Sequence, residues 1–392
     1  MELRGKISKG KLVASGVIPF AFVILLIVYL FGSSGNLLDV GVSLPEVTIE
    51  KIDFVDGEIQ ATVRNTGHIP VEVAMADVND RIQSAAIEPD RFLNRFETAL
   101  VRIPFDWNKS EPYTIGITTA DGVRFEKEIK AATEALKPSG ELVGYFAIIG
   151  TYIGIIPIMI GLLWLPFIKR ISKAKYNFFL AITVGLLLFL GIDAIKEATE
   201  ISAKFLAGSF NGILLIATVV ILSFLGLYYS GNKLVKRADA SPYAKPVALG
   251  LMIAIGIGLH NFGEGLAIGA AVGLGEVAFS TFLLVGFALH NTSEGFAIAA
   301  PMAKGKPMIG KLVGMGLIAG TPAIFGAWIG GFAYSPFTAI MFLSIGSGAI
   351  FQVAMAILGW IRKEDDKFLA SASVVAGIAT GMLIMYITSI LV

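Results

Sequence analysis

Residues 260–265 read His-Asn-Phe-Gly-Glu-Gly, and residues 290–295 read His-Asn-Thr-Ser-Glu-Gly. Each copy lies inside a long apolar run, and together they contain two of the three histidines in the chain. Ionisable side chains are costly in the hydrocarbon of a bilayer, where they are rare unless they serve a function. The repeated pattern therefore indicates a bundle of membrane helices with a polar site inside it.

The composition of the chain supports this class of fold. Of the 392 residues, 55% are hydrophobic and 16% are charged, and the mean hydropathy is +0.76. A soluble domain usually has roughly 25% charged residues. The net charge of +1 does not indicate a nucleic-acid partner. There is no cysteine, which excludes disulfides and thiolate metal ligands.

Apolar runs of about 20 residues each predict nine transmembrane helices. The first covers residues 12–31 and follows a basic stretch. A cleaved signal peptide is the competing interpretation, but its apolar region would be only about 7–15 residues long, so we favour an uncleaved anchor. The other eight runs cover residues 142–168, 177–199, 209–229, 246–273, 277–301, 308–332, 336–360 and 368–391.

Residues 36–137 differ from the rest of the chain, because charged residues are dense there. Residues 47–52 and 59–64 alternate in polarity, as half-buried strands do. About 100 residues with several short strands fit a small β-sandwich. Residues 63–67 and 71–73 resemble the immunoglobulin-like modules of prokaryotic surface proteins. We therefore predict a β-sandwich domain inserted after the anchor helix.

Basic residues fill alternate loops of the predicted bundle, and the loops between them are nearly free of Lys and Arg. By the positive-inside rule, the basic loops and the N-terminus are cytoplasmic. The expected protein is a multi-pass protein of the cell (plasma) membrane, with an extracellular C-terminus. Its predicted domains are a cytoplasmic N-terminus with an anchor helix at 1–35, an extracellular β-sandwich at 36–137, and an all-α bundle of eight helices at 138–392.

Helical spacing places the polar residues of each repeated motif on one face. His260 and Glu264 are four residues apart, and Asn261 and Glu264 are three apart. If the two helices pack together, two imidazoles and two carboxylates converge. Such ligands suit Zn²⁺, and also Fe²⁺ or Mn²⁺. The predicted primary ligands are His260, Glu264, His290 and Glu294, with Asn261 and Asn291 at a second, weaker ion.

The alternative interpretation of the motifs is structural. Each polar side chain would then only hydrogen-bond across a helix interface and hold the bundle together. Two copies with the same residues at the same positions in consecutive helices favour the metal site. Glycines at four-residue spacing, Gly265, Gly269 and Gly273, predict that the helices approach closely there.

The paired motifs resemble those of the ZIP (Zrt/Irt-like) family of divalent metal transporters. The fourth and fifth of the eight helices in that family carry His-Asn-x-Pro-Glu-Gly and a variant of it. Here the resemblance covers residues 142–391, and the motifs fall in the fourth and fifth apolar runs. The resemblance implies a binuclear metal centre on a pathway into the cytoplasm, and a homodimer.

The chain departs from the family pattern at three positions. Gly263 and Ser293 replace the motif proline, so the usual proline kink is missing. The family's sixth helix commonly carries Glu-Pro, and here Thr321 precedes Pro322. The secondary site then lacks one carboxylate, and we expect one tightly bound metal ion per chain.

Three further residues are pathway candidates. Asp193 and Glu197 share one face near the predicted outer end of the second of the eight helices. The resemblance implies an acidic pair there that guides ions, whereas the alternative is a solvated helix end with an Asp193–Lys196 pair. Gln352, in the seventh helix, is the third candidate.

The predicted function is inward transport of divalent transition metal ions, with Zn²⁺ first and Fe²⁺ or Mn²⁺ as alternatives. The metal is cargo, so no bound cofactor is expected, and the partners are the ion and the lipid bilayer. An intramembrane zinc hydrolase is a second hypothesis, but the His-Glu-x-x-His motif of zinc proteases is absent, and we predict that the chain is not an enzyme. A metal-sensing surface protein that binds a partner through its β-domain is a third hypothesis.

Overall fold

The computed structural model describes residues 44–135, 139–205, 211–237, 244–273, 277–303, 309–364 and 371–390, and residues 17–18, 21–22 and 24–25 near the N-terminus. The chain divides into two compact units, Met1–Pro45 and Glu46–Val392. The six described residues of the predicted anchor helix are helical, and the rest of that prediction lies outside the described residues. Three of the basic residues in the predicted loops, Lys304, Lys306 and Lys367, also lie outside them.

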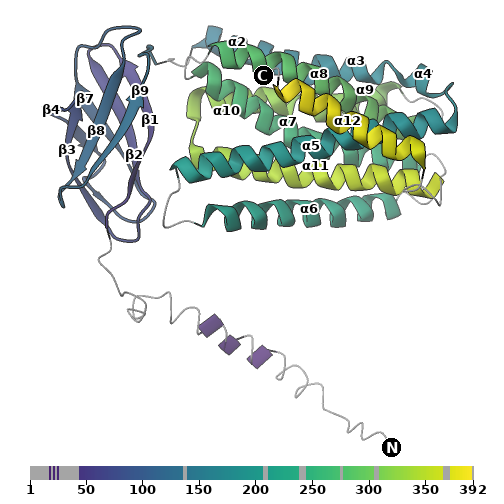
Figure 1. Ribbon diagram of the computed structural model, residues 1–392, viewed down its shortest axis with the longest axis horizontal. Coiled ribbons are helices and arrows are strands. Elements are labelled where there is room, and N and C mark those ends of the chain that lie inside the picture. The colour runs from purple at the N-terminus through teal and green to yellow at the C-terminus, as the bar shows by residue number, and fades with distance from the viewer. Residues whose placement is uncertain are drawn as a thin grey trace, which may run out of the picture. The chain divides into compact units, whose positions relative to one another are not determined.

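Nine strands form two antiparallel sheets at the start of the second unit (Figure 1). The strand order is β1-β2-β7-β5 in one sheet and β4-β3-β8-β9 in the other, where β6 also pairs with β3. The strands are β1 (Val47–Val55), β2 (Glu58–Asn65), β3 (Val71–Val78), β4 (Arg81–Gln83), β5 (Ala86–Glu88), β6 (Phe92–Leu93), β7 (Thr98–Pro104), β8 (Tyr113–Thr119) and β9 (Arg124–Ile129).

One hydrophobic core joins the two sheets. Buried and half-buried residues alternate along β2, as the pleat of a half-buried strand requires. Ile59 of β2 and Val101 of β7 meet Val73 of β3 and Ile117 of β8 in a single cluster of fully buried side chains. The two strands predicted at residues 47–52 and 59–64 are confirmed as parts of β1 and β2, which pair antiparallel.

A salt bridge in the second sheet depends on a glycine. Arg124 Nη2 lies 2.7 Å from Asp77 Oδ1, and Arg124 Nε donates to Asp77 Oδ2 at 2.9 Å. A Cβ atom on Gly116 would lie 2.0 Å from Asp77 Oδ2 and 2.6 Å from Arg124 Nε. The strand therefore has space for this salt bridge only because residue 116 has no side chain.

Gly116→Ala is expected to displace this salt bridge and to destabilise the β-domain by about 1–3 kcal/mol, the usual cost of overpacking. The measurement is the rate at which a protease cleaves the β-domain in the full-length protein. Thr118→Ala, in the same strand, is the matched control. Equal cleavage rates for the two variants would contradict this account of Gly116.

The remaining described residues of the second unit form a helical bundle (Figure 1). Within the described part of the chain, six helical segments are long and apolar enough to cross a membrane: Gly140–Ile168, Lys173–Phe205, Gly212–Arg237, Ala244–Gly273, Ile309–Ala333 and Pro336–Arg362. The predicted fold class, a helical membrane bundle with a small antiparallel β region, is confirmed, and the predicted number of membrane helices stays a prediction. The helices are α2 (Gly140–Gly150), η2 (Thr151–Ile155), α3 (Ile156–Leu162), α4 (Leu165–Ile168), α5 (Lys173–Phe205), α6 (Gly212–Arg237), α7 (Ala244–Gly273), α8 (Val277–Met302), α9 (Ile309–Gly320), α10 (Pro322–Ala333), α11 (Pro336–Glu364) and α12 (Ala372–Ile390).

Two of the predicted helices are interrupted. The run at residues 142–168 contains η2, a π-helical turn, and a short break before α4. The run at 308–332 divides into α9 and α10 at Thr321, directly before Pro322. Proline has no N–H to donate and clashes with the preceding turn, which explains the second break.

The glycine row of α7 packs against α10. A Cβ atom on Gly265 would lie 2.1 Å from the Ala323 carbonyl oxygen, and one on Gly269 would lie 2.3 Å from that of Ala327. Close approach of α7 to a neighbour is confirmed, since such small residues let helix backbones meet. Its partner is α10, whereas the sequence analysis expected the other motif helix.

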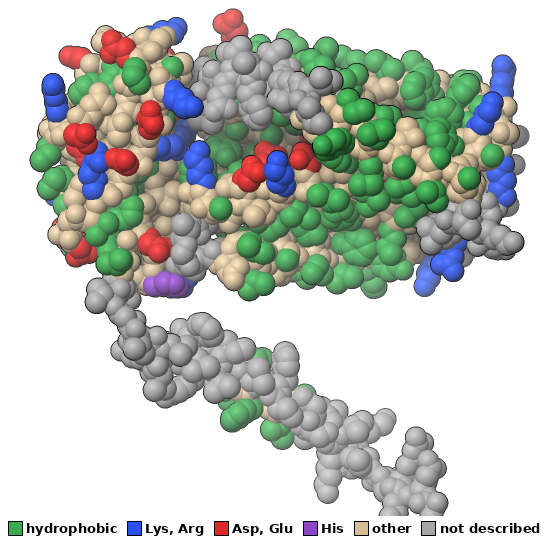
Figure 2. Space-filling view, in the orientation of Figure 1, with side chains coloured by type: hydrophobic (Ala, Val, Ile, Leu, Met, Phe, Trp, Pro, Cys, Tyr) green, Lys and Arg blue, Asp and Glu red, His purple; other side chains and the backbone are tan. Residues whose placement is uncertain are grey.

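Many basic residues of the bundle gather at one end of it, whereas Lys196 and Lys204 lie near the opposite end, where α5 ends (Figure 2). Helix α5 begins at Lys173 and α6 ends at Arg237, while Lys245 lies in the first turn of α7 and Arg362 in the last turn of α11. This clustering is the pattern that the positive-inside rule describes. The assignment of this end to the cytoplasm stays a prediction.

Candidate metal site

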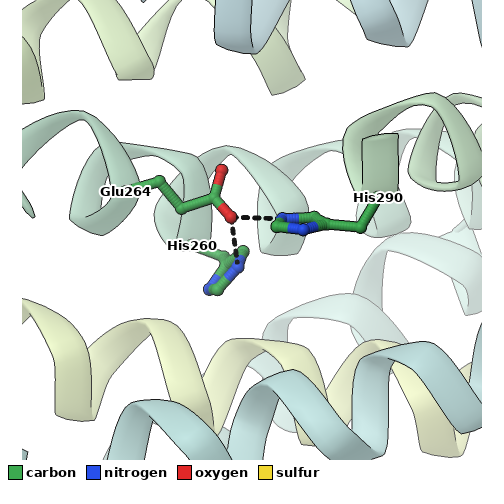
Figure 3. A group of neighbouring side chains, drawn as sticks. All are labelled: His260, Glu264 and His290. Atoms are coloured by element: carbon green, nitrogen blue, oxygen red, sulfur yellow. Dashed lines mark hydrogen bonds and ion pairs between the residues drawn. The ribbon is translucent and has the colours of Figure 1, made fainter. Parts of the chain in front are cut away.

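Helices α7 and α8 bring together three residues of the repeated motifs. His260 and Glu264 lie one turn apart on α7, and His290 lies on α8. Glu264 Oε1 lies 3.1 Å from His260 Nε2 and also contacts His290 Nε2 (Figure 3). Among the described residues, these three form the one group of His, Asp and Glu side chains whose ligand atoms all lie within 4.8 Å of one another.

The chemistry of this cluster suits a divalent transition metal. All three side chains are buried, with at most 7% of each residue exposed. Burying ionisable groups is costly unless they are paired or bind a metal. Two imidazole nitrogens and a carboxylate oxygen that converge on one point are an established ligand set for Zn²⁺, which would leave one coordination position for water or another ligand.

Asn291 orients the central carboxylate. Its Nδ2 donates to Glu264 Oε2 at 2.9 Å and to the Ile153 carbonyl at 3.0 Å. Ile153 belongs to the π-helical turn η2, and such turns are frequent at functional sites. Partners of this kind fix the direction of a ligand and tune its affinity for metal. The first motif has a similar bond, since Asn261 Nδ2 donates to the Ala319 carbonyl at 3.1 Å.

Glu294 lies outside the three-residue cluster. Its side chain is buried, with 1% of the residue exposed. Neither of its carboxylate oxygens, nor Oδ1 of Asn261 or Asn291, has a hydrogen-bond partner among the described residues. Buried polar atoms are rarely left without partners. These four oxygens are therefore candidate ligands for a second cation.

Two pathway candidates border the cluster. A cavity of ≈ 50 Å³ is lined by His260 and Glu264 together with Asp193 and Glu197 of α5. A second cavity of ≈ 180 Å³ shares Glu197 with the first and continues to Tyr334, at the end of α10. Asp193 is exposed and Glu197 is half-buried, so these two carboxylates lie between the surface of the bundle and the His260 cluster.

The expected alternative for this helix end was an ion pair between Asp193 and Lys196. The salt bridge on this turn instead joins Lys196 to Glu200, at 3.7 Å, and both side chains are largely exposed. The Lys196–Glu200 pair lies beyond Asp193 on α5, and Asp193 lines the cavity beside His260. Asp193 is itself exposed, so the ion-guiding role of Asp193 and Glu197 stays a prediction.

Gln352 does not reach the metal cluster. It is buried and follows the cavity residue Gly346 by six positions on α11, but it lines a different cavity.

Thr321 is half-buried at the break between α9 and α10. The bond from Asn261 to Ala319 shows that the motif of α7 contacts the helix segment just before Thr321.

Three apolar residues of the site carried no signal in the sequence analysis. Phe287, Phe342 and Gly346 line the cavity beside the cluster. The Phe287 ring lies 5.7 Å from the His290 ring, and a Cβ atom on Gly346 would lie 3.2 Å from His260 Cα. The spacing of Phe287, three residues before His290, could have indicated its contact with the site, whereas nothing marks the two residues of α11.

No protein-family model and no curated protein matches this chain. Among solved structures, the chain is similar to the archaellum periplasmic stator protein FlaG from Sulfolobus acidocaldarius. The match covers 22% of this chain and 100% of the other, with 16% sequence identity and a TM-score of 0.20. A likeness this low carries no argument about fold or function.

Proposed function

We propose that this chain is a ZIP-like transporter that moves divalent transition metal ions across a membrane. The observation that carries the proposal is the cluster of His260, Glu264 and His290, buried inside a bundle whose helices are long enough to cross a bilayer. Its nitrogen and oxygen ligands suit Zn²⁺ first, with Fe²⁺ and Mn²⁺ as alternatives. The metal is the cargo of the protein.

The proposal includes a topology. All eight apolar segments between Gly140 and Ile390 cross the membrane, and residues 12–31 add an N-terminal anchor. The basic end of the bundle faces the cytoplasm, so the β-domain and the acidic cavity face outward. Ions then pass inward across the cell membrane, in a protein that forms a homodimer. The clustering of Lys and Arg at one end supports this orientation.

The mechanism follows from the arrangement of ligands. A hydrated dication cannot cross hydrocarbon, so Glu197 and Asp193 attract it and the His260 cluster replaces part of its water. Binding must be tight enough to select the ion and weak enough to release it. Imidazoles and carboxylates can take up protons, which would loosen the site.

Alternating exposure of the site requires two groups of helices that move relative to each other. Helix α7, which has two of the clustered ligands, packs against α8, α9 and α10, and α5, which has the acidic pair, packs against α11 and α12. Helix α11 packs against both α5 and α7, so it joins the two sets of helices. In the proposed mechanism, a change in the packing of α11 against α7 would alter access from Asp193 and Glu197 to the cluster.

Glu197→Gln is expected to raise the KM for Zn²⁺ uptake several-fold and to leave Zn²⁺ affinity at the His260 cluster nearly unchanged. The reason is that Glu197 lines the approach and does not belong to the cluster. Initial uptake rates against Zn²⁺ concentration, together with calorimetric titration, measure the two effects. Glu200→Gln, which neutralises an exposed carboxylate on the same helix, is the matched control. An unchanged KM in Glu197→Gln would remove the ion-guiding role.

Thr321→Glu is expected to strengthen the binding of a second ion, with little effect on the first. The unmodified chain offers the second ion two amide oxygens and shared carboxylates, and fewer charged ligands bind a dication more weakly. Calorimetric titration with Zn²⁺ should therefore change from one tight event to two. Thr321→Gln, which lacks the charge, should behave as the unmodified chain. Two ions of comparable affinity in the unmodified chain would contradict this picture.

Metal accumulation in cells tests the proposed function. Cells that produce the chain should accumulate more Zn²⁺ than cells that produce His290→Ala at the same abundance in the membrane. The alanine variant lacks one of the three clustered ligands. Equal accumulation in both would separate the cluster from transport and would favour a metal-sensing role.

A further inference from the structure

A third cavity lies between α6, α7 and α11, away from the metal cluster. Its volume is ≈ 740 Å³, and it shares no lining residue with the cavity beside His260. Binding sites for small molecules usually measure about 300–1,000 Å³. We call this cavity the α6–α11 groove, and the residues that define it here are Tyr228, Lys245, Met252, Gln352, Met355 and Arg362.

The groove has an inner end and a basic end. Met252 lines the inner end, and a Cβ atom on Gly231 of α6 would lie 2.2 Å from its Sδ atom, so α6 and α7 are in contact there. At the other end lie Lys245 and Arg362, in the basic part of the bundle. Gln352 and Arg362 are ten residues apart on α11, which is about 15 Å along a helix. That length is about half of the ~30 Å hydrocarbon core of a bilayer.

The walls between these ends are mostly apolar and open to the side. Tyr228 is 47% exposed and Met355 is 51% exposed, while Leu249 and Ala356 line the interior. Trp360 lies two residues before Arg362 and lines the same end of the groove. Tryptophan is enriched where the hydrocarbon meets the headgroups of a bilayer. A molecule that fits this groove has an anionic head and an apolar tail.

We propose that the α6–α11 groove binds one anionic phospholipid of the leaflet at the basic end. Its phosphate lies between Lys245 and Arg362, and an acyl chain extends past Leu249 and Met355. Basic pockets between membrane helices bind anionic headgroups in this way. The charged side chains among the described lining residues are Lys245 and Arg362, and two cationic groups at one end suit an anionic head. The proposal does not depend on metal transport.

The first experiment measures thermal unfolding of the purified, delipidated full chain in detergent. Phosphatidylglycerol should raise the unfolding midpoint, because a ligand that binds the folded state stabilises it. Phosphatidylcholine should not raise it. The double variant Lys245→Gln/Arg362→Gln should lose the shift, and the control Arg170→Gln/Lys236→Gln, with the same loss of charge at the same end, should keep it. Equal shifts in the two double variants would overturn the proposal.

The second experiment fills the groove. Gly359 lines it, and a Cβ atom there would meet nothing within 4 Å, so phenylalanine can occupy the space without a clash. Gly359→Phe should lose the bound phosphatidylglycerol seen by native mass spectrometry. Gly226→Phe, at an equally open position of α6 outside the groove, should retain it. Lipid retained in Gly359→Phe, or an equal thermal shift with soluble glycerol phosphate, would overturn the lipid assignment.

Discussion

Glu264→Gln is expected to abolish metal binding and uptake together, with a loss of affinity above ~100-fold. Mutating a residue that only orients a metal ligand typically costs ~10–100-fold, and Glu264 is itself a candidate ligand. One of its carboxylate oxygens faces both His260 and His290, and the other accepts from Asn291. Glutamine keeps the size of the side chain and removes the charge.

Calorimetric titration with Zn²⁺ and uptake into sealed vesicles measure the two losses. Glu200→Gln removes an exposed carboxylate elsewhere in the bundle and should behave as the unmodified chain. Unchanged Zn²⁺ uptake by a folded, membrane-inserted Glu264→Gln protein would remove this residue from the metal site.

Gly265→Ala is expected to destabilise the bundle strongly, whereas Gly263→Ala is expected to leave its stability unchanged or slightly raised. The two glycines belong to the same motif, but a Cβ atom on Gly265 would lie 2.1 Å from the Ala323 carbonyl, and one on Gly263 would lie 3.8 Å from that of Phe342. Separating α7 from α10 costs about 1–3 kcal/mol or more. Alanine is a better helix former than glycine by about 1 kcal/mol. At position 263 this gain is not opposed by a steric clash.

Thermal unfolding of the two variants in detergent measures this difference. Gly263 also lines both cavities beside the cluster, so its alanine variant should fold normally and still transport more slowly. A lower unfolding midpoint for Gly263→Ala than for Gly265→Ala would contradict the packing described for α7.

The helices of the bundle could be predicted well from the sequence, because apolar length alone marks a segment that can cross a membrane. The run predicted at residues 246–273 corresponds to α7, Ala244–Gly273. Pro322 could have indicated the break between α9 and α10, since proline interrupts helical hydrogen bonding. The π-helical turn η2 has no comparable marker. It was therefore found only in the structure, where its Ile153 carbonyl accepts from Asn291.

The metal site could be predicted in part. Spacing within one helix places His260 and Glu264 together, and the structure confirms this contact. Spacing cannot give the rotation of α8 relative to α7. His290 reaches the cluster, whereas Glu294, four residues later on the same helix, lies outside it.

Contacts between elements were the least predictable part of the fold. The spacing of Gly265 and Gly269 indicates that some helix approaches closely, but a stripe of small residues does not specify its partner, which proved to be α10. The same holds for Gln352. A buried amide in a membrane helix indicates a polar environment, but its assignment to the α6–α11 groove depends on the arrangement of three helices.

Zn²⁺ flux into sealed vesicles that contain only the purified full chain is the most direct test of the proposed transport. The account predicts saturable uptake above that of protein-free vesicles, and uptake at the protein-free level for His260→Ala/His290→Ala. Uptake by the unmodified chain that does not exceed that of protein-free vesicles, with Zn²⁺ bound and the protein folded, would contradict transport.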